Sequence, residues 1–368
     1  MSGLRHLVVT TGGTGGHIFP ALAVAAEFKA RDAARQVTFI GASGPEGELA
    51  RKAELDFVAL PARGVLGTGL RKLATPVWLA KGLLKALWTL RRLRPDAVLG
   101  FGGYAGFCPV PAAWLCGIPC AIHEQNSVPG AANRTLRHFV RTIFLSFEET
   151  VSWFPAKKTV LTGNPVRADI AQAGRTPRPG TRSLLVLGGS QGARALNDAV
   201  IEALPELRKA AITVRHQAGA SDVDRVRREC TDAGFDPDGP QIRVSGFIDD
   251  MAQAYAEADL IFCRSGASTV FEAAAAGRPC IFVPYPHATH NHQALNARAM
   301  EQAGAARVIP QDGLGGGSLA GMVVGLLNNQ EKLDRMAEAA KDFAKPDAAA
   351  RIVDHLEEQA AKHKGRNA

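Results

Sequence analysis

The sequence predicts an α/β protein with two doubly wound domains, each a parallel sheet covered by helices on both faces. Short apolar, β-branched runs alternate with Ala- and Leu-rich helical stretches along the whole chain, which is typical of parallel strands buried on both faces. The length of 368 residues suits two ordinary domains. A glycine-rich turn also follows the first predicted strand of each half. Together these features indicate two Rossmann-like domains.

The strands predicted in the first half are HLVVTT, QVTFIGA, DAVLGFGG, PCAIHEQ, TIFLSF and TVLTGNP. Those in the second half are SLLVLGGS, ITVRHQAG, IRVSGFI, ADLIFCRSG, PCIFVPYP and AARVIP. Helical stretches such as PALAVAAEFKA and ALNDAVIEALPELRKA lie between them. Residues 171–182 are rich in Pro, Gly and Arg and show no apolar periodicity. We therefore expect one domain over 1–165 and another over 166–344, with a helix within 345–368 packing back on the first.

The composition bears on membrane insertion, on secretion and on the state of the cysteines. No run of 18 apolar residues predicts a membrane-spanning helix, and the N-terminal residues lack the apolar core of a secretory signal. Six cysteines show no CxxC spacing and mostly lie in apolar runs. We expect them to be buried, reduced thiols.

The net charge of +8 is unevenly distributed. Residues 1–165 hold nineteen Lys and Arg against ten Asp and Glu, whereas the remainder is nearly balanced. No acidic residue occurs between Asp56 and Asp96, a gap that contains Arg63, Arg71, Lys72, Lys81, Lys85, Arg91, Arg92 and Arg94. A one-sided basic region favours an anionic surface as partner, although a solvated helix face would have the same composition.

Both glycine turns, GGTGGH at 12–17 and GGSQGA at 188–193, follow a strand and open a helix. Bare backbone there lets N–H groups approach an anion at a helix N-terminus. The dinucleotide fingerprint is broken because Ile18 stands where a third glycine is needed, and no Gly-Lys-Ser/Thr follows either turn. The sequence thus favours a bound phosphate over NAD binding or ATP hydrolysis. His17, at the mouth of the first turn, could accept a proton from an attacking hydroxyl.

Polar clusters follow other strands. FGGYAGF presents Tyr104, HEQNSVPG places His123 to Asn126 at a strand's carboxyl end, and GNPVR places Arg167 near the domain boundary. In the second half, Glu272 falls on the first turns of a helix, where a carboxylate can accept two vicinal hydroxyls. Three histidines in PHATHNHQALNA match no familiar zinc spacing, so we predict no metal and sugar hydroxyls as the partners of this segment.

The motifs GGTGGHIFPALAVA, FGGYAGF, HEQNSVPG, GNPVR, GGSQGA, GFIDDM, CRSGASTVFEAAAAGRP and HQALNA occur in an order that closely resembles the MurG family of bacterial glycosyltransferases. The resemblance covers about residues 5–350. It implies a GT-B fold, two Rossmann-like domains facing a cleft. It also implies an inverting transfer of N-acetylglucosamine from UDP-GlcNAc to the 4-hydroxyl of the muramyl sugar of lipid I, giving lipid II for peptidoglycan synthesis. No metal or cofactor is implied.

Carried over by position, the resemblance assigns the acceptor to the first domain and UDP-GlcNAc to the second. It favours His17 as the catalytic base, with Glu124 as the alternative. The substrate-binding positions that it implies are Thr14, Gly15, Gly16, Tyr104, Asn126, Arg167, Ser190, Ile248, Ala267, Ser268, Thr269, Val270, Phe271, Glu272 and Gln293. Some family members carry Gln-Gln where this chain has His292-Gln293, so His292 receives no role.

With a membrane-embedded acceptor, the basic gap gains a specific interpretation. The helical stretch 76–94 mixes Trp and Leu with Lys and Arg, a composition suited to a helix lying on an anionic leaflet. We therefore expect peripheral attachment to the cytoplasmic face of the plasma membrane and no nucleic-acid partner. The resemblance is also compatible with a complex with other cell-wall synthesis proteins.

Other classes of protein share some of these sequence features. A glycolipid synthase or a UDP-GlcNAc 2-epimerase would share the two-domain fold. A membrane-surface scaffold that binds a nucleotide as a switch would share the phosphate turns without catalysis. A nicotinamide oxidoreductase is disfavoured by the broken fingerprint and by the lack of an acidic residue closing the second strand, QVTFIGA.

Overall fold

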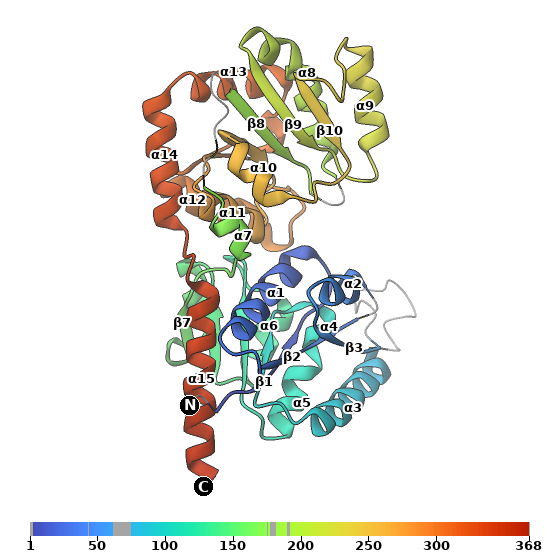
Figure 1. The fold of residues 1–368 in the computed structure, drawn as a ribbon, viewed down its shortest axis with the longest axis vertical. Helices are drawn as coiled ribbons and strands as arrows, with labels where there is room; N and C mark the ends of the chain where they lie inside the picture. The colour runs from blue at the N-terminus through green and yellow to red at the C-terminus, as the bar shows by residue number, and fades with distance from the viewer. Residues whose placement is uncertain are drawn as a thin grey trace. The chain divides into compact units, whose positions relative to one another are not determined.

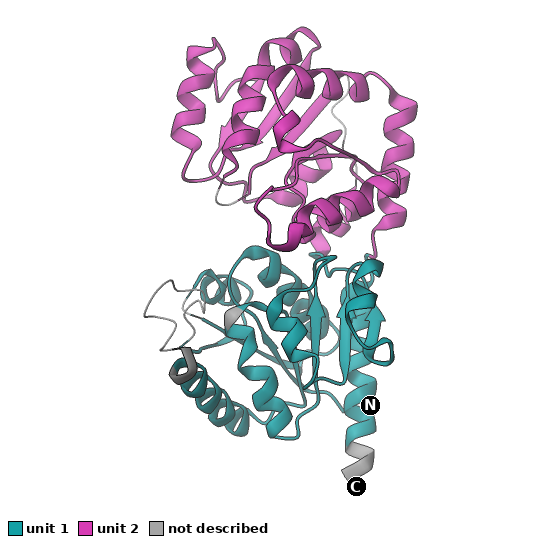
Figure 2. Cartoon of the chain, turned by 180° about the vertical axis from the view of Figure 1, so that it is seen from behind, with its two compact units in different colours: residues 1–167, 346–368 teal, residues 168–345 magenta. Residues whose placement is uncertain are grey.

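A computed structural model describes residues 3–42, 44–61, 75–174, 176, 182–189 and 192–367 (Figure 1). The chain divides into two compact units (Figure 2). Unit 1 comprises residues 1–167 and 346–368, and unit 2 comprises residues 168–345. Each unit has its own parallel sheet.

Unit 1 holds a seven-stranded parallel sheet of order β3-β2-β1-β4-β5-β6-β7. The order reverses between β1 and β4, and a reversal of this kind opens a crevice at the carboxyl ends of the two strands. The strands are β1 (His6–Thr10), β2 (Gln36–Gly41), β3 (Asp56–Ala59), β4 (Ala97–Gly100), β5 (Cys120–Glu124), β6 (Thr142–Leu145) and β7 (Thr159–Leu161).

Both faces of this sheet are buried, which explains its continuous apolar strands. Leu7 and Val9 point into one core, while Val8 points into the other. The helical elements of unit 1 are α1 (Gly15–Ala30), α2 (Pro45–Lys52), α3 (Thr75–Leu93), α4 (Gly103–Phe107), α5 (Pro109–Leu115), α6 (Ala131–Leu136), the short η2 (Glu148–Trp153) and η3 (Ala156–Lys158), and the last helix, α15 (Ala348–Asn367).

Helix α15 packs against α1 within unit 1 (Figure 1). Its apolar residues Ile352, Val353, Leu356 and Ala360 are buried in the same core as the inner face of α1. At the margin of this contact, Arg31 lies 2.6 Å from Asp354, and Arg35 lies 2.7 Å from Glu357. The C-terminal segment therefore completes the core of the unit in which the chain begins.

Unit 2 holds a six-stranded parallel sheet of order β10-β9-β8-β11-β12-β13, which reverses between β8 and β11. Its strands are β8 (Arg182–Leu187), β9 (Ile212–Gln217), β10 (Ile242–Ser245), β11 (Leu260–Cys263), β12 (Cys280–Phe282) and β13 (Ala306–Val308). Its helices are α7 (Ala168–Ala171), α8 (Arg194–Lys209), α9 (Val223–Asp232), α10 (Met251–Glu257), α11 (Ala267–Ala275), η4 (Thr289–Asn291), α12 (His292–Gln302), η5 (Gln311–Gly313), α13 (Gly316–Leu327) and α14 (Gln330–Phe343).

None of the helices in the described ranges is both long enough and apolar enough to cross a bilayer. The six cysteines are unpaired, and four of them are buried. Of the eight basic residues in the acid-free gap, Arg63, Arg71 and Lys72 lie outside the described residues.

Candidate active site

Two glycine turns of unit 1 interlock at the crevice between β1 and β4. A Cβ on Gly103 would lie 1.9 Å from the carbonyl oxygen of Gly12, and a Cβ on Gly12 would lie 2.7 Å from the Cβ of Ala105. Gly103 also has a φ of +75°, a region that favours glycine. Glycine is required at these positions because the two turns pack backbone to backbone.

The first turn presents the N-terminus of α1. Thr14 is the N-cap residue but makes no side-chain capping bond, and no acidic residue lies in the first turn of the helix. Arg167 brings a positive charge there: its guanidinium lies 5.0 Å from the ring centre of Phe19, and that ring covers Gly15. Gly15 and Gly16 are half-buried, and Thr14 is exposed. A helix N-terminus beside a guanidinium is suited to a phosphate.

A side-chain relay selects the tautomer of His17. Gln125 Nε2 donates to the carbonyl of Phe101 at 3.1 Å, which identifies Oε1 as the amide atom 2.9 Å from His17 Nδ1. Since Oε1 can only accept, Nδ1 carries the proton of neutral His17 and Nε2 keeps its lone pair. Within the described part of the chain, no hydrogen bond to Nε2 is found. The half-buried ring is therefore preset as a proton acceptor.

His123 continues this relay beneath Gln125. Its Nδ1 lies 3.2 Å from Gln125 Nε2, and its Nε2 lies 3.1 Å from the carbonyl of Gly163, so Nδ1 accepts and Nε2–H donates. Burial lowers the pKa of His123 to about 4, and the ring is neutral at physiological pH. His123 therefore supports Gln125 and does not itself exchange protons.

Glu124 is placed differently from a base. Its side chain is buried, and its carboxylate accepts from the N–H of Asn126, the N–H of Gly130 and the side-chain amide of Asn133. These bonds hold the loop after β5 and the start of α6. This geometry gives Glu124 a structural role in presenting Asn126, whose own carbonyl accepts from Thr150 at 3.1 Å.

Asn133 is a functional candidate that was not predicted from the sequence. It is 2% exposed and donates from Nδ2 to Glu124 and to the carbonyl of His123, yet its Oδ1 is buried without a hydrogen-bond partner in the described residues. A Cβ placed on Gly102 would stand 3.6 Å from this oxygen and 3.7 Å from Cε1 of His17. Asn133 and His17 therefore both lie against Gly102. Its position on a helix, seven residues beyond the polar cluster, gave no signal in the sequence.

The second glycine turn lies at the switch point of unit 2. A Cβ on Gly188 would lie 2.9 Å from the carbonyl oxygen of Gln217, and one on Gly192 would lie 2.7 Å from that of Ala218. The buried Asn197 on α8 donates to that Ala218 carbonyl and to Asp222. The turn is thus held against the end of β9 and leads into the N-terminus of α8. Ser190 lies outside the described residues.

The backbone N–H of Ile248 is bonded within the protein. It donates to Oε1 of Gln217 at 3.1 Å. Gln217 is buried at the end of β9. Because its oxygen faces Ile248, its amide nitrogen is the remaining donor of the pair.

The turn after β11 opens α11, the helix that carries Glu272. The N-cap is Gly266, and Ala267, Ser268 and Thr269 form the first turn, which contains no acidic residue. Tyr255, fully buried on α10, donates its hydroxyl to Glu272 Oε2 at 3.1 Å. Burial, together with Glu272, raises the pKa of Tyr255 well above its ordinary value, so the phenol stays a donor and orients the carboxylate.

Two residues of the expected substrate-binding stretch 267–272 have buried side chains. Val270 and Phe271 have side chains with 0% and 2% exposure; Phe271 packs against Phe343, and the N–H of Val270 donates to Gly266. Both side chains are buried inside unit 2 with the apolar face of α11. A substrate contact at these two positions stays a prediction, and the burial leaves it to the backbone.

Gln293 is brought to the turn after β11. Its carbonyl accepts from the hydroxyl of Ser265 at 2.8 Å, and its Oε1 accepts from the N–H of Tyr285 at 2.9 Å. Asn296, one helical turn further along α12, donates to the carbonyl of Ser265. These bonds fix the N-terminus of α12 beside that of α11.

The expected site residue Tyr104 belongs to unit 1. Its backbone lies in α4, and its side chain is not among the described parts of the structure.

Within the described ranges, no group of three or more His, Cys, Asp and Glu side chains is arranged to hold a metal ion. His287 packs edge-on against Tyr285, and His292 Nδ1 lies 2.8 Å from the carbonyl of Thr289. These two histidines therefore serve the local structure of the segment before α12.

Comparison with known proteins agrees with this architecture. The glycosyltransferase family 28 N-terminal domain matches residues 7–145, and the family's C-terminal domain matches residues 183–352. A UDP-N-acetylglucosamine–N-acetylmuramyl-(pentapeptide) pyrophosphoryl-undecaprenol N-acetylglucosamine transferase of Solidesulfovibrio magneticus is 51% identical over 98% of this chain and all of its own. One of the same name from Geobacter sulfurreducens is 42% identical over 95% of this chain and 97% of its own.

Solved structures show the same fold. The crystal structure of Acinetobacter baumannii MurG is 35% identical, with a TM-score of 0.77 over 96% of this chain and 99% of its own. A UDP-GlcNAc 2-epimerase from Neisseria meningitidis, bound to UDP-GlcNAc, has a TM-score of 0.69 over 96% of this chain and all of its own at 15% identity, which shows the fold alone.

Two parallel α/β units with glycine turns at their switch points define the GT-B class of glycosyltransferases. Within that class, the chain belongs to glycosyltransferase family 28, with the MurG transferases named above.

Proposed function

We propose that the chain transfers N-acetylglucosamine from UDP-GlcNAc to the muramyl 4-hydroxyl of lipid I, an undecaprenyl-pyrophosphoryl acceptor, forming lipid II and UDP for peptidoglycan synthesis. The names of its relatives supply the donor and acceptor. The observation that carries the chemistry is the bond from His17 Nδ1 to Gln125, since it leaves Nε2 unprotonated.

In this reaction Nε2 of His17 takes the proton of the acceptor hydroxyl as its oxygen attacks the anomeric carbon from the face opposite UDP. The new C–O bond forms as the bond from the anomeric carbon to the phosphate oxygen breaks, and UDP leaves with the electron pair, inverting the carbon. We assign the base to His17 in preference to Glu124, because three donors already occupy that buried carboxylate.

The donor is assigned to unit 2. The N-termini of α8 and α11 are oriented to offset the negative charge that develops on the departing diphosphate. Glu272, oriented by Tyr255, accepts the ribose hydroxyls, and the carbonyl of Ile248 accepts from the uracil N3–H while Gln217 donates to its O4. Gln293 and Asn126 are assigned to the sugar.

The acceptor is assigned to unit 1. The exposed end of α1 and Arg167 provide charge for its pyrophosphate. We assign Asn133, whose buried Oδ1 lacks a hydrogen-bond partner in the described residues, to the support of the site beside Gly102.

We further propose that unit 1 attaches peripherally to the cytoplasmic face of the plasma membrane through α3 and α5, which pack together. Trp78, Leu84 and Trp88 of α3 and Trp114 and Leu115 of α5 are at least 37% exposed. On the outer face of α3, Trp78, Leu84 and Trp88 alternate with exposed Lys81, Arg91 and Arg92. Apolar side chains ringed by cations are suited to an anionic leaflet.

The direct test is turnover with UDP-GlcNAc and one of two acceptors, lipid I or diacylglycerol. We expect UDP release and a disaccharide product with lipid I only, and a loss of rate in His17→Ala. Conversion of UDP-GlcNAc without any acceptor would instead identify an epimerase, and product with diacylglycerol would identify a glycolipid synthase. UDP binding without release on adding either acceptor would identify a nucleotide-binding scaffold.

A further inference from the structure

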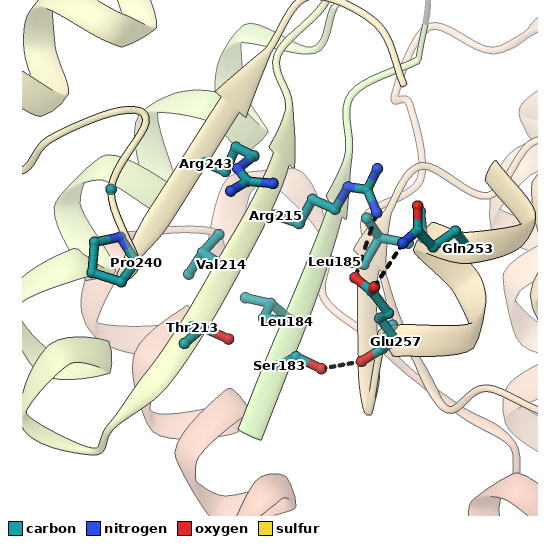
Figure 3. Close-up of a pocket in the computed structure, with 13 residues that line it drawn as sticks. Ser183, Leu184, Leu185, Thr213, Val214, Arg215, Pro240, Arg243, Gln253 and Glu257 are labelled. Carbon is teal, nitrogen blue, oxygen red and sulfur yellow. Dashed lines mark hydrogen bonds and ion pairs between the residues drawn. The ribbon is translucent and has the colours of Figure 1, made fainter. Parts of the chain in front are cut away.

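Unit 2 contains a cavity of about 160 Å³ away from its glycine turns (Figure 3). Its floor is formed by β8, β9 and β10 toward their amino ends, from Ser183 and Thr213 onward, and one wall is α10. The glycine turn 188–193 leaves the opposite, carboxyl end of β8. The cavity therefore plays no part in the proposed transfer, and its volume is several times what an ordered water requires.

Two arginines project into this cavity from neighbouring strands. Arg215 of β9 and Arg243 of β10 are direct partners in the parallel register, and Figure 3 shows both on the same side of the sheet. Leu185 of β8 continues the row and is buried. Like charges placed opposite one another on adjacent strands destabilise a sheet, so this pair carries an electrostatic cost.

The surrounding acidic groups compensate that cost only in part. Glu257 of α10 lies 3.7 Å from Arg215, and the same carboxylate accepts from Gln253 at 3.0 Å. Asp238, the acidic group that acts on Arg243, directs its carboxylate to both terminal nitrogens of Arg227. In the described part of the chain, Arg243 has no ion pair of its own. The charged groups lining the cavity are thus two guanidiniums and one carboxylate.

We propose that this cavity binds a small phosphate-type anion, inorganic phosphate or the phosphate group of a small ester, between Arg215 and Arg243. Two planar guanidinium groups match the oxygen geometry of a phosphate, and the anion removes the repulsion between them. Glu257 opposes binding by its charge and competes for Arg215. The charge of Arg243 therefore favours binding of the anion, and the charge of Glu257 weakens it.

The test uses residue-specific protection. The full-length protein, with saturating UDP present, is treated with phenylglyoxal at increasing inorganic phosphate, with sodium chloride of equal ionic strength as the reference. Modification of each arginine is read by peptide mass spectrometry. We expect phosphate to protect Arg215 and Arg243 saturably, and to leave the exposed Arg335 on α14 unprotected.

Two variants give opposite signs. Arg243→Gln should weaken the protection of Arg215 by about tenfold or more, because a charge-assisted bond is lost, and Glu257→Gln should strengthen it. Equal protection by chloride, or unchanged midpoints in both variants, would overturn the proposal. UDP affinity is measured separately, so absence of UDP binding would count against the proposed transferase function and leave the Arg243 result interpretable.

Discussion

His17 Nδ1 lies 2.9 Å from Oε1 of Gln125, and the opposite face of that amide is fixed by the carbonyl of Phe101. An uncharged acceptor behind the imidazole selects the tautomer and stabilises the protonated ring less than a carboxylate would. The arrangement suits a base that must release its proton after each turnover.

Replacing the amide by a carboxylate tests this relay. In Gln125→Glu, a negative charge beside Nδ1 stabilises the imidazolium relative to the neutral ring. Activity that requires neutral His17 then appears at higher pH, so the rising limb of kcat/KM against pH should move up by about one pH unit or more. His17→Ala should lose about 100- to 10,000-fold in kcat together with that limb. A limb unmoved in Gln125→Glu would argue against the relay.

Tyr255→Phe should raise KM for UDP-GlcNAc about three- to tenfold with little change in kcat, since one hydrogen bond to Glu272 is lost. The phenyl ring fills the same buried space, so the fold is kept. Glu272→Ala should cost more, and adding Tyr255→Phe to it should have no further effect on KM. Additive losses in the double variant would mean that Tyr255 acts through another group.

A matched pair of glycines separates backbone strain from collision. Gly103 and Gly117 have φ values of +75° and +71°, but a Cβ on Gly117 meets nothing within 4 Å, whereas one on Gly103 meets the Gly12 carbonyl at 1.9 Å. Gly117→Ala should lower the free energy of unfolding by about 1–2 kcal/mol. Gly103→Ala should lower it by about 3 kcal/mol or more. Equal losses in urea titrations would show that the two turns separate easily.

Vesicle binding should depend on both components of the α3 face. Replacing Lys81, Arg91 and Arg92 with Gln removes about 1 kcal/mol each, or about a hundredfold in binding to anionic vesicles at low salt. Trp88→Ser should weaken binding at low and high salt alike, because burial of its ring is insensitive to screening. The control replaces Lys209, Arg335 and Lys362, which are exposed outside this face. An equal loss in the control would reduce the effect to net charge.

Stability should fall with acid through the buried histidines. Burial lowers the pKa of His216 from its ordinary 6.5 to about 4. Between these two pH values the unfolded chain binds a proton at this histidine, and the folded chain does not. The stabilising contribution is complete above pH 6.5 and is lost as pH falls toward 4. His216→Gln should reduce the slope there by up to about 1.4 kcal/mol per pH unit. Hydrogen exchange of the β9 amides measures the free energy of unfolding at each pH. An unaltered slope in His216→Gln would contradict the assignment of this pH dependence to His216.

The fold class could be predicted because apolar strands, helical stretches and turn glycines repeat in one order along the chain. Gly12 and Gly188 could be predicted as turn positions because close backbone approach demands glycine. His17 could be predicted as a site residue because it is the single titratable side chain next to the first glycine turn. Positions on helices are harder. Asn133, Tyr255 and Gln217 act through contacts with residues remote in sequence, and Val270 and Phe271 lie on the buried side of a helix whose other side carries Glu272. Orientation around a helix axis depends on tertiary packing, which no local motif encodes.

The docking of α15 on α1 has a consequence for biosynthesis. The apolar side of α1, formed by some of the earliest residues to leave the ribosome, is covered by residues translated after the whole of 168–345. At about 5–20 residues per second, that surface waits on the order of ten seconds or longer for its partner. During this interval the nascent chain exposes an apolar surface on α1. Chaperones bind such surfaces, and neighbouring nascent chains aggregate through them.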